Sequence, residues 1–194
     1  PEFNEVITNF NGKTHYALML KKICEYEPRR QFVVNIIKNI IDESKTNNIE
    51  RQIMVIAHNK TILSYIYNFI NENNLASVGF YIGGMKEKDL KETESKQIVI
   101  ATYAMAEEAL DIKTLNTLIM VTPKTDVTQT VGRILRKADN NPLVVDIIDQ
   151  HSRFFNQWKK RRAFYNKCKY TIRNDIKENA DEKKSSLLKG KCLL

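Results

Sequence analysis

Five short apolar runs constrain the fold of this chain more than any other feature of its sequence. They lie at residues 53–57, 78–82, 98–101, 118–121 and 143–148. Each run has the length of a strand that is buried on both faces, and a polar or helical pattern separates it from the next. Alternating strands and helices predict an α/β fold in which a parallel sheet of about five or more strands is flanked by helices. Ligands of such sheets bind at the carboxyl ends of the strands.

Apolar residues recur at helical spacing between several of these runs. The spacing predicts helices over residues 30–44 and 62–70, and a short exposed helix over residues 85–94. Residues 16–23 favour a short strand or an extended connector. A basic helical extension begins at Ser152, and one stripe of this helix is expected to pack on the domain. That stripe consists of Phe154, Trp158, Tyr165 and Cys168.

The charge of the chain favours a polyanionic partner. The formal net charge is +8 and the isoelectric point is near 9.3, and lysine and arginine side chains that neutralise phosphates release counterions. Much of the excess lies after residue 158, however, and a basic tail is often only solvated. Cys24, Cys168 and Cys192 lack metal-binding spacing, which indicates a reducing, intracellular compartment. No apolar run approaches the length that spans a bilayer, so we expect no membrane partner.

The stretch from Thr128 to Arg136 carries the strongest candidate site. In a helix, Gln129, Arg133 and Arg136 share one face, and two guanidiniums one turn apart can grip phosphate oxygens. The alternative is that this arginine pair simply lies in solvent. A second phosphate motif is suggested by Asn-Gly-Lys-Thr at residues 11–14. It lacks the first glycine of a P-loop, because Ile7 stands there, and a connecting turn is the better interpretation.

Three segments in order resemble a known family. Thr102 ends a predicted strand, Glu108-Ala-Leu-Asp111 follows in a loop, and Gln129, Arg133 and Arg136 come about twenty residues later. This order resembles motifs five and six of the superfamily 2 helicases and translocases. Residues 53–70 are similar to motif four. The flanking helices resemble those of large-DNA-virus helicases and phage branch-migration helicases.

The resemblance implies a division into three parts. Residues 1–29 would be a linker and connector from a missing N-terminal domain, and residues 30–150 the C-terminal, RecA-like domain of a helicase. Residues 151–194 would be a basic helical extension and a flexible tail. ATP and Mg²⁺ would be bound mainly by the missing domain, because this chain has no complete phosphate loop and no magnesium-binding motif. The chain alone should not hydrolyse ATP. A viral helicase of this kind would be cytoplasmic, which includes a viral replication site, or nuclear.

The resemblance also implies roles for single residues. Arg136 would be the arginine finger, Arg133 would reach the ATP phosphates, and Gln129 would order their helix at the nucleotide. Asp111 would meet the ribose or hold an arginine. The nucleic-acid backbone would be contacted by Thr102, His58, Asn59 and Gly83. Other roles remain open: His58 could cap the following helix, and Glu107 and Glu108 could be solvated or structural ligands.

Two departures from the family pattern limit the assignment. Ala109 stands where the family often has glycine, and the sixth motif lacks the form found in DEAD-box RNA helicases, so DNA is the expected substrate rather than RNA. An alternative function is a non-catalytic RecA-like module that binds nucleic acid or a protein. A third hypothesis makes the positive charge itself the main function.

Overall fold

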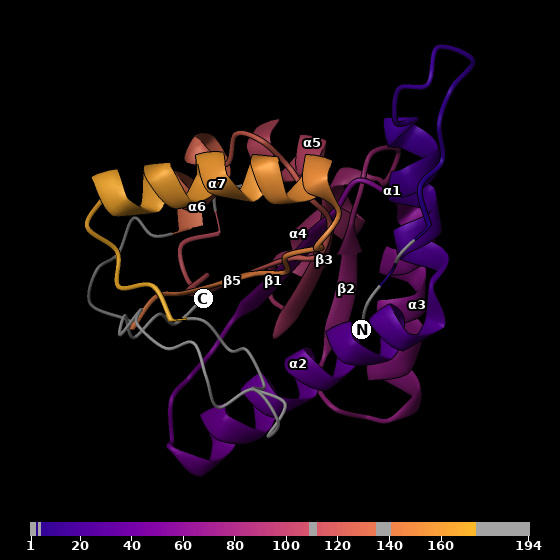
Figure 1. The fold of residues 1–194 in the computed structure, drawn as a ribbon. Coiled ribbons are helices and arrows are strands. Elements are labelled where there is room, and N and C mark those ends of the chain that lie inside the picture. The colour runs from indigo at the N-terminus through magenta and orange to yellow at the C-terminus, as the bar shows by residue number, and fades with distance from the viewer. Residues whose placement is uncertain (1–2, 4, 109–111, 135–140, 174–194) are drawn as a thin grey trace, which may run out of the picture.

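The five predicted strands form one parallel sheet. The computed structural model describes residues 3, 5–108, 112–134 and 141–173, and it arranges the strands in the order β2-β3-β1-β4-β5 (Figure 1). All four pairings are parallel, which confirms the predicted fold class. The bounds of the strands are β1 Ile53–Ala57, β2 Val78–Tyr81, β3 Ile98–Thr102, β4 Thr117–Met120 and β5 Leu143–Asp146.

Helices cover both faces of the sheet. One face is covered by α1 (Tyr16–Glu25), α2 (Glu27–Thr46) and α3 (Lys60–Glu72). The other face is covered by α4 (Glu87–Glu94), α5 (Tyr103–Glu108), α6 (Thr128–Ile134) and α7 (Ser152–Lys167) (Figure 1). None of the helices in the described part of the chain is long and apolar enough to cross a membrane.

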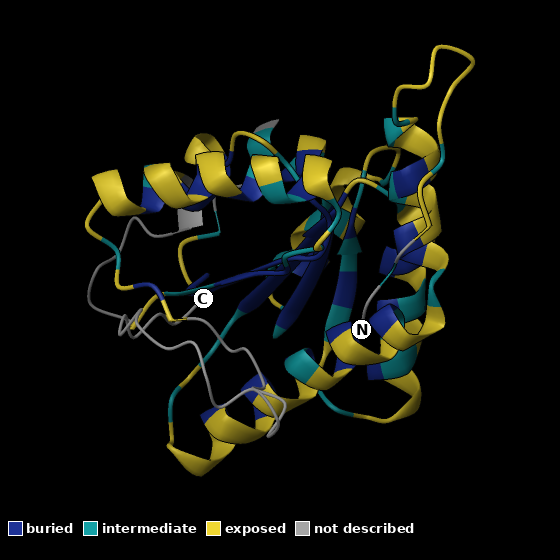
Figure 2. Cartoon of the chain, in the orientation of Figure 1, coloured by how far each residue is buried: buried dark blue, intermediate teal, exposed yellow. Residues whose placement is uncertain are grey.

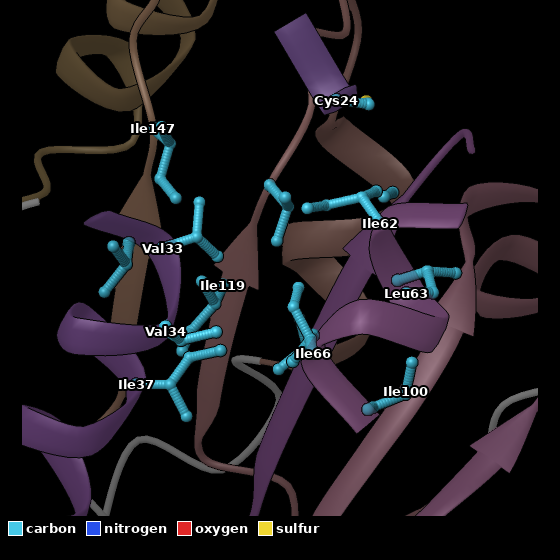
Figure 3. Packing of buried hydrophobic residues seen from close by; sticks show 14 of the residues in the cluster. Cys24, Val33, Val34, Ile37, Ile62, Leu63, Ile66, Ile100, Ile119 and Ile147 are labelled. Atoms are coloured by element: carbon cyan, nitrogen blue, oxygen red, sulfur yellow. The ribbon is translucent and has the colours of Figure 1, made fainter. Parts of the chain in front are cut away.

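Successive residues of the central strand serve two separate cores. Ile53 and Val55 of β1 belong to the core under α1, α2 and α3, whereas Met54 and Ile56 belong to the core on the opposite face. This alternation follows from the period of two along a strand. All five β1 residues are buried, as the dark blue strands of Figure 2 illustrate. Figure 3 shows the first core, with Val33, Val34 and Ile37 of α2 packed beside Ile119 and with Ile62, Leu63 and Ile66 of α3 lying toward Ile100.

Residues 16–23 are helical, so the prediction of a strand or an extended connector is wrong. They lie in α1, whose N-cap His15 accepts a hydrogen bond from the Leu18 backbone at 3.3 Å. Met19 and Ile23 are one turn apart and are fully buried. Their spacing therefore serves a helix, and the segment is too short for periodicity to separate the two possibilities.

The Asn-Gly-Lys-Thr segment is a turn, as predicted. Thr8 and Thr14 form an antiparallel bridge, and the Asn9 side-chain oxygen accepts hydrogen bonds from the backbone of Asn11 at 3.1 Å and of Lys13 at 3.0 Å. Gly12 closes this turn with φ of +70°, a conformation that favours glycine.

The aromatic side of α7 packs on the domain. Phe154, Trp158 and Tyr165 are buried, which confirms the predicted packing face. Cys168 is exposed at the end of the helix, so its inclusion in that stripe was wrong. The fourth buried residue of this face is Arg161, whose guanidinium binds Asp146 through two hydrogen bonds of 2.7 and 2.8 Å.

We predict that Arg161→Met destabilises the fold by about 3–5 kcal/mol, because Asp146 then remains buried without its guanidinium. Denaturant unfolding measures this loss. The matched control is Arg162→Met, since Arg162 is exposed on the same helix and lies over the Trp158 ring. Its expected cost is below about 1 kcal/mol. Equal destabilisation by the two substitutions would contradict a structural role for the buried pair.

Candidate functional site

The carboxyl ends of the strands meet at one edge of the sheet, and the four candidate residues for nucleic-acid contact lie there. His58 and Asn59 follow β1, Gly83 follows β2 after one intervening residue, and Thr102 is the last residue of β3. The chain diverges beside β1, because β1 leads to α3 on one face whereas its neighbours β3 and β4 lead to α5 and α6 on the other. Such a divergence is where open parallel sheets bind ligands.

His58 is fixed to the end of β4. Its backbone N–H donates to Thr122 Oγ1 at 3.0 Å, and its ring Nδ1 lies 3.0 Å from the same oxygen. The Thr122 hydroxyl can donate to Nδ1 or accept from it, since its oxygen has two lone pairs and one proton. The ring also packs on Tyr103, with 4.4 Å between centroids. The backbone and the ring of His58 are therefore both held by Thr122 at the strand-end edge.

Partial burial and the positive charge of Lys124 lower the pKa of His58, while Glu107 opposes them. The ring is thus neutral at neutral pH. It does not cap α3, as one alternative had it. The cap is Asn59, whose side-chain oxygen accepts from the Thr61 backbone at 2.7 Å.

Thr102 and Gly83 both lie next to Met105 of α5. The Thr102 hydroxyl accepts from the Met105 backbone at 3.4 Å at the start of this helix. A Cβ atom at Gly83 would lie 3.9 Å from the Met105 sulfur, an ordinary contact, and Gly83 has no positive φ. The neighbouring Gly84 does, with φ of +92°. The turn therefore requires glycine at 84 and not at 83, where the absence of a side chain leaves the exposed edge open.

The segment between β4 and α6 is held by side chains from four other elements. We call residues 121–124 the clamped segment, because each of its four backbone carbonyls accepts a hydrogen bond from a side chain. The pairs are Arg29 with Val121 O (2.6 Å), Tyr103 with Thr122 O (2.7 Å), Tyr16 with Pro123 O (3.2 Å) and Arg161 with Lys124 O. The donors come from α2, α5, α1 and α7.

Both arginines of the clamp are neutralised by carboxylates that lie at or after the end of β5. Arg161 binds Asp146, which also accepts from the Tyr165 hydroxyl at 3.2 Å. Arg29 binds Asp149 through hydrogen bonds of 2.6 and 2.9 Å. Burial raises the pKa of the Asp146 carboxyl, and the bound guanidinium of Arg161 opposes this effect. These bidentate pairs compensate for the burial of two guanidiniums.

The clamped segment is joined to α6 by residues 125–127. Asp126 accepts from the Thr128 backbone at 2.9 Å and begins the helix, and Val131 on its inner side is fully buried. Thr130 donates to Glu107 at 3.1 Å, and Glu107 also binds Lys124. Glu107 is thus a structural ligand between α5 and α6 rather than a solvated carboxylate.

The described residues include only part of the predicted phosphate site. Gln129 is exposed on α6, as is Gly132. The backbone of Arg133 is helical, whereas Arg136 and Asp111 lie outside the described residues. No group of three or more His, Cys, Asp or Glu side chains in the described ranges could hold a metal ion.

Sequence reasoning missed the residues that hold the edge together. Asp146 interrupts an apolar run, which was a usable signal for a buried ion pair. Arg161 lies at helical spacing from Phe154, Trp158 and Tyr165, which places it on the buried face. Tyr103 and Thr122 gave no comparable signal, because polar residues after a strand are common.

The chain is similar in sequence to proteins of large DNA viruses, whereas no family model matches it. It is 35% identical over 171 residues to "Putative ATP-dependent RNA helicase L396" of Acanthamoeba polyphaga mimivirus, which covers 86% of this chain and 32% of the relative. It is 24% identical over 188 residues to "Putative ATP-dependent RNA helicase QP509L" of African swine fever virus, with coverage of 89% and 37%. The chain thus spans about a third of the length of these relatives.

Solved structures share the fold. Phage T4 UvsW matches with a TM-score of 0.61 at 20% identity. The match covers 82% of this chain and 36% of the UvsW chain. The helicase domain of Pyrococcus furiosus Hef has a TM-score of 0.54 at 16% identity, with coverage of 75% and 30%. Domain 2 of the DEAD-box helicase Mss116p, solved on an RNA duplex, has a TM-score of 0.52 at 11% identity, with coverage of 70% and 56%.

We predict that His58 titrates below its ordinary pKa of 6.5 and that Lys124→Met raises this pKa by removing a nearby positive charge. Because folding lowers this pKa, the histidine contributes stability above pH 6.5 that is lost as the pH falls through the folded-state value. NMR titration of the ring protons, assigned with His58→Asn, measures both values. Lys38→Met on α2 is the control. A midpoint unchanged by Lys124→Met would refute the assigned cause.

Proposed function

We infer that this chain, which is homologous to viral proteins named as ATP-dependent helicases and has the fold of the second RecA-like domain of superfamily 2, is the C-terminal motor domain of an ATP-dependent nucleic-acid helicase or translocase. The observation that carries this proposal is the shared edge of the sheet. Thr102, His58, Asn59 and the loop at Gly83 lie along the strand ends, and α6 leaves from the same edge.

The proposed contacts with the nucleotide come from residues of α6 and from positions that follow it in the sequence. Arg136 is proposed as the arginine finger, with Arg133 on the phosphates and Gln129 ordering the helix. The exposure of Gln129 and Gly132 supports this orientation, because it leaves one side of α6 open to a second domain. Asp111 is proposed to meet the ribose or to hold an arginine.

ATP with Mg²⁺ would supply the phosphoryl group whose transfer to water drives the motor. The chemistry of the donors fits one half of such a site, since guanidiniums stabilise the negative charge that spreads over the transferred oxygens. The Mg²⁺ and most of the nucleotide are assigned to another domain, which would also carry the phosphate loop. The residues of this chain therefore stabilise charge in trans, and closure of the two domains would bring them into place.

The proposed contacts with nucleic acid come from small polar groups at the strand ends. The His58 ring, the Asn59 amide and the Thr102 hydroxyl suit a phosphate backbone, which is contacted without reading of sequence. Gly83 supports close approach of a ligand, because its own turn does not require glycine.

Thr122 connects the proposed nucleic-acid contacts with the segment that leads to the proposed nucleotide site. His58 binds its hydroxyl, and Tyr103, which directly follows Thr102, donates to its carbonyl. Movement of the nucleic-acid contacts would therefore be transmitted to the clamped segment and on to α6. This connection is the proposed link between grip on the strand and hydrolysis.

The choice between DNA and RNA stays a prediction. The sixth motif favours DNA, but the names of the viral relatives specify RNA helicases and give this preference no support. Parallel measurements with matched DNA and RNA ligands decide it.

We predict that Arg136→Ala lowers the nucleic-acid-stimulated kcat of the full-length protein by about 10³-fold or more, because a finger arginine contributes that much to phosphoryl transfer. Steady-state ATPase assays with single-stranded, duplex and forked DNA and RNA measure this. Lys38→Ala, an exposed position on α2, should leave the rate unchanged. Retained activity in Arg136→Ala excludes the finger. A stimulated rate that is absent even in the wild-type full-length protein favours the non-catalytic module.

A second prediction concerns the strand-end contacts. Thr102→Val should weaken binding of nucleic acid at fixed salt by roughly 3–10-fold, because one hydrogen bond to phosphate is lost. Fluorescence anisotropy with a labelled single strand measures the dissociation constant, and Thr46→Val on α2 is the matched control. If both variants bind like the wild type, the backbone contact at Thr102 is refuted and binding by charge alone is favoured.

A further inference from the structure

The outward side of α7 carries a concentration of positive charge that the proposed motor site does not use. The helix contains six cationic residues and no aspartate or glutamate. Arg161 is the inward one, and Asp146 neutralises it. We call the four exposed cations of the second half of the helix the basic face of α7. They are Lys159, Lys160, Arg162 and Lys167.

Some exposed lysines on other helices of this chain are paired within their own helix. Glu87 pairs with Lys91 within α4, at 2.9 Å and a spacing of four residues, and Lys21 pairs with Glu25 in the same way within α1. In the described part of the chain, no carboxylate forms an ion pair with the basic face of α7. Like charges at helical spacing repel, so this face costs the helix some stability. Its composition is therefore better explained by a partner than by folding.

Two of the cations lie over aromatic rings. The Lys159 ammonium lies 5.2 Å from the centroid of Phe155, and the Arg162 guanidinium lies 5.3 Å from the centroid of Trp158. These contacts hold the side chains against the helix and limit the conformational entropy that binding would cost. The charges are thus presented by a fixed surface, and Figure 2 shows the outward side of α7 as exposed and its inner side as buried.

The helix is joined to the segment that leads into α6. Gln157 donates to the Thr125 hydroxyl at 3.0 Å, and Arg161 donates to the Lys124 carbonyl. At the N-terminal end of α7, Arg153 donates to the Thr14 carbonyl at 3.3 Å and lies over the Tyr16 ring. The basic face therefore keeps a fixed position relative to the strand-end site (Figure 1).

We propose that the basic face of α7 binds the phosphate backbone of a nucleic acid, as a contact surface additional to the strand ends. Its lysines are point charges that bind phosphate without reading sequence, and binding gains free energy from the counterions that are released. The choice of nucleic acid over an acidic protein rests on the proposed function. The contact itself requires neither ATP nor a second domain.

The test uses the purified 194-residue chain and a fluorescently labelled single-stranded oligonucleotide, without nucleotide, over a series of salt concentrations. The double variant Lys160→Gln/Lys167→Gln removes two exposed charges and should retain the wild-type unfolding midpoint. Each lost phosphate contact lowers the slope of log K against log salt by about 0.7 for a single strand, so the slope should fall by about 1.4. At 0.1 M salt this corresponds to binding about 25-fold weaker.

The matched control is Lys38→Gln/Lys45→Gln, which removes the same charge from exposed positions of α2. The proposal expects a much smaller loss of affinity in this control. Equal losses in the two double variants would overturn it in favour of general charge attraction. An unchanged slope in the α7 variant would overturn it as well and leave an acidic protein as the partner. Because no ATP is present, this result is independent of the ATPase assay on Arg136→Ala.

Discussion

Four consecutive backbone carbonyls between β4 and α6 accept hydrogen bonds from side chains of four different elements, and the candidate site depends on this clamp. A loop that leaves a sheet normally satisfies its carbonyls with water or with its own turn. Here α1, α2, α5 and α7 each supply one donor. The path of the chain into α6 is therefore set by the whole domain, and both faces of the sheet contribute to it. This arrangement fixes the position at which α6, the predicted phosphate-binding helix, begins.

The clamp requires two guanidiniums to be buried, and the fold meets this requirement with two carboxylates. Arg29 and Arg161 are each 2% exposed, and each is bound bidentately by an aspartate at or after the end of β5. A buried pair of this kind adds little net stability, yet removal of one partner is costly. Its contribution is mainly to specificity of position, since a planar fork binds a carboxylate and a carbonyl in one geometry. The same helix that supplies Arg161 inward presents unpaired cations outward.

The sequence was sufficient to predict the sheet and insufficient to predict the clamp. The five strands could be predicted because β1 is apolar over its whole length and each of its neighbours has only one polar residue, at a strand end. The position of Thr102 and His58 at strand ends followed directly. By contrast, α1 was misread because ten residues are too few for apolar spacing to separate a helix from a strand. The contacts of Tyr103, Tyr16 and Arg161 join residues up to 107 positions apart, and such pairings depend on packing that no local pattern encodes.

The hydrogen bond from Tyr16 to the Pro123 carbonyl gives the domain a mechanical property. Tyr16 begins α1 directly after the hairpin at residues 8–14, and its ring also carries the Arg153 guanidinium. Tension applied to the chain before α1 would be borne by this tyrosine, and its hydroxyl would pass the load to the clamped segment at 3.2 Å. The position of α1 and the path of the chain into α6 are therefore linked by a contact between residues 107 positions apart.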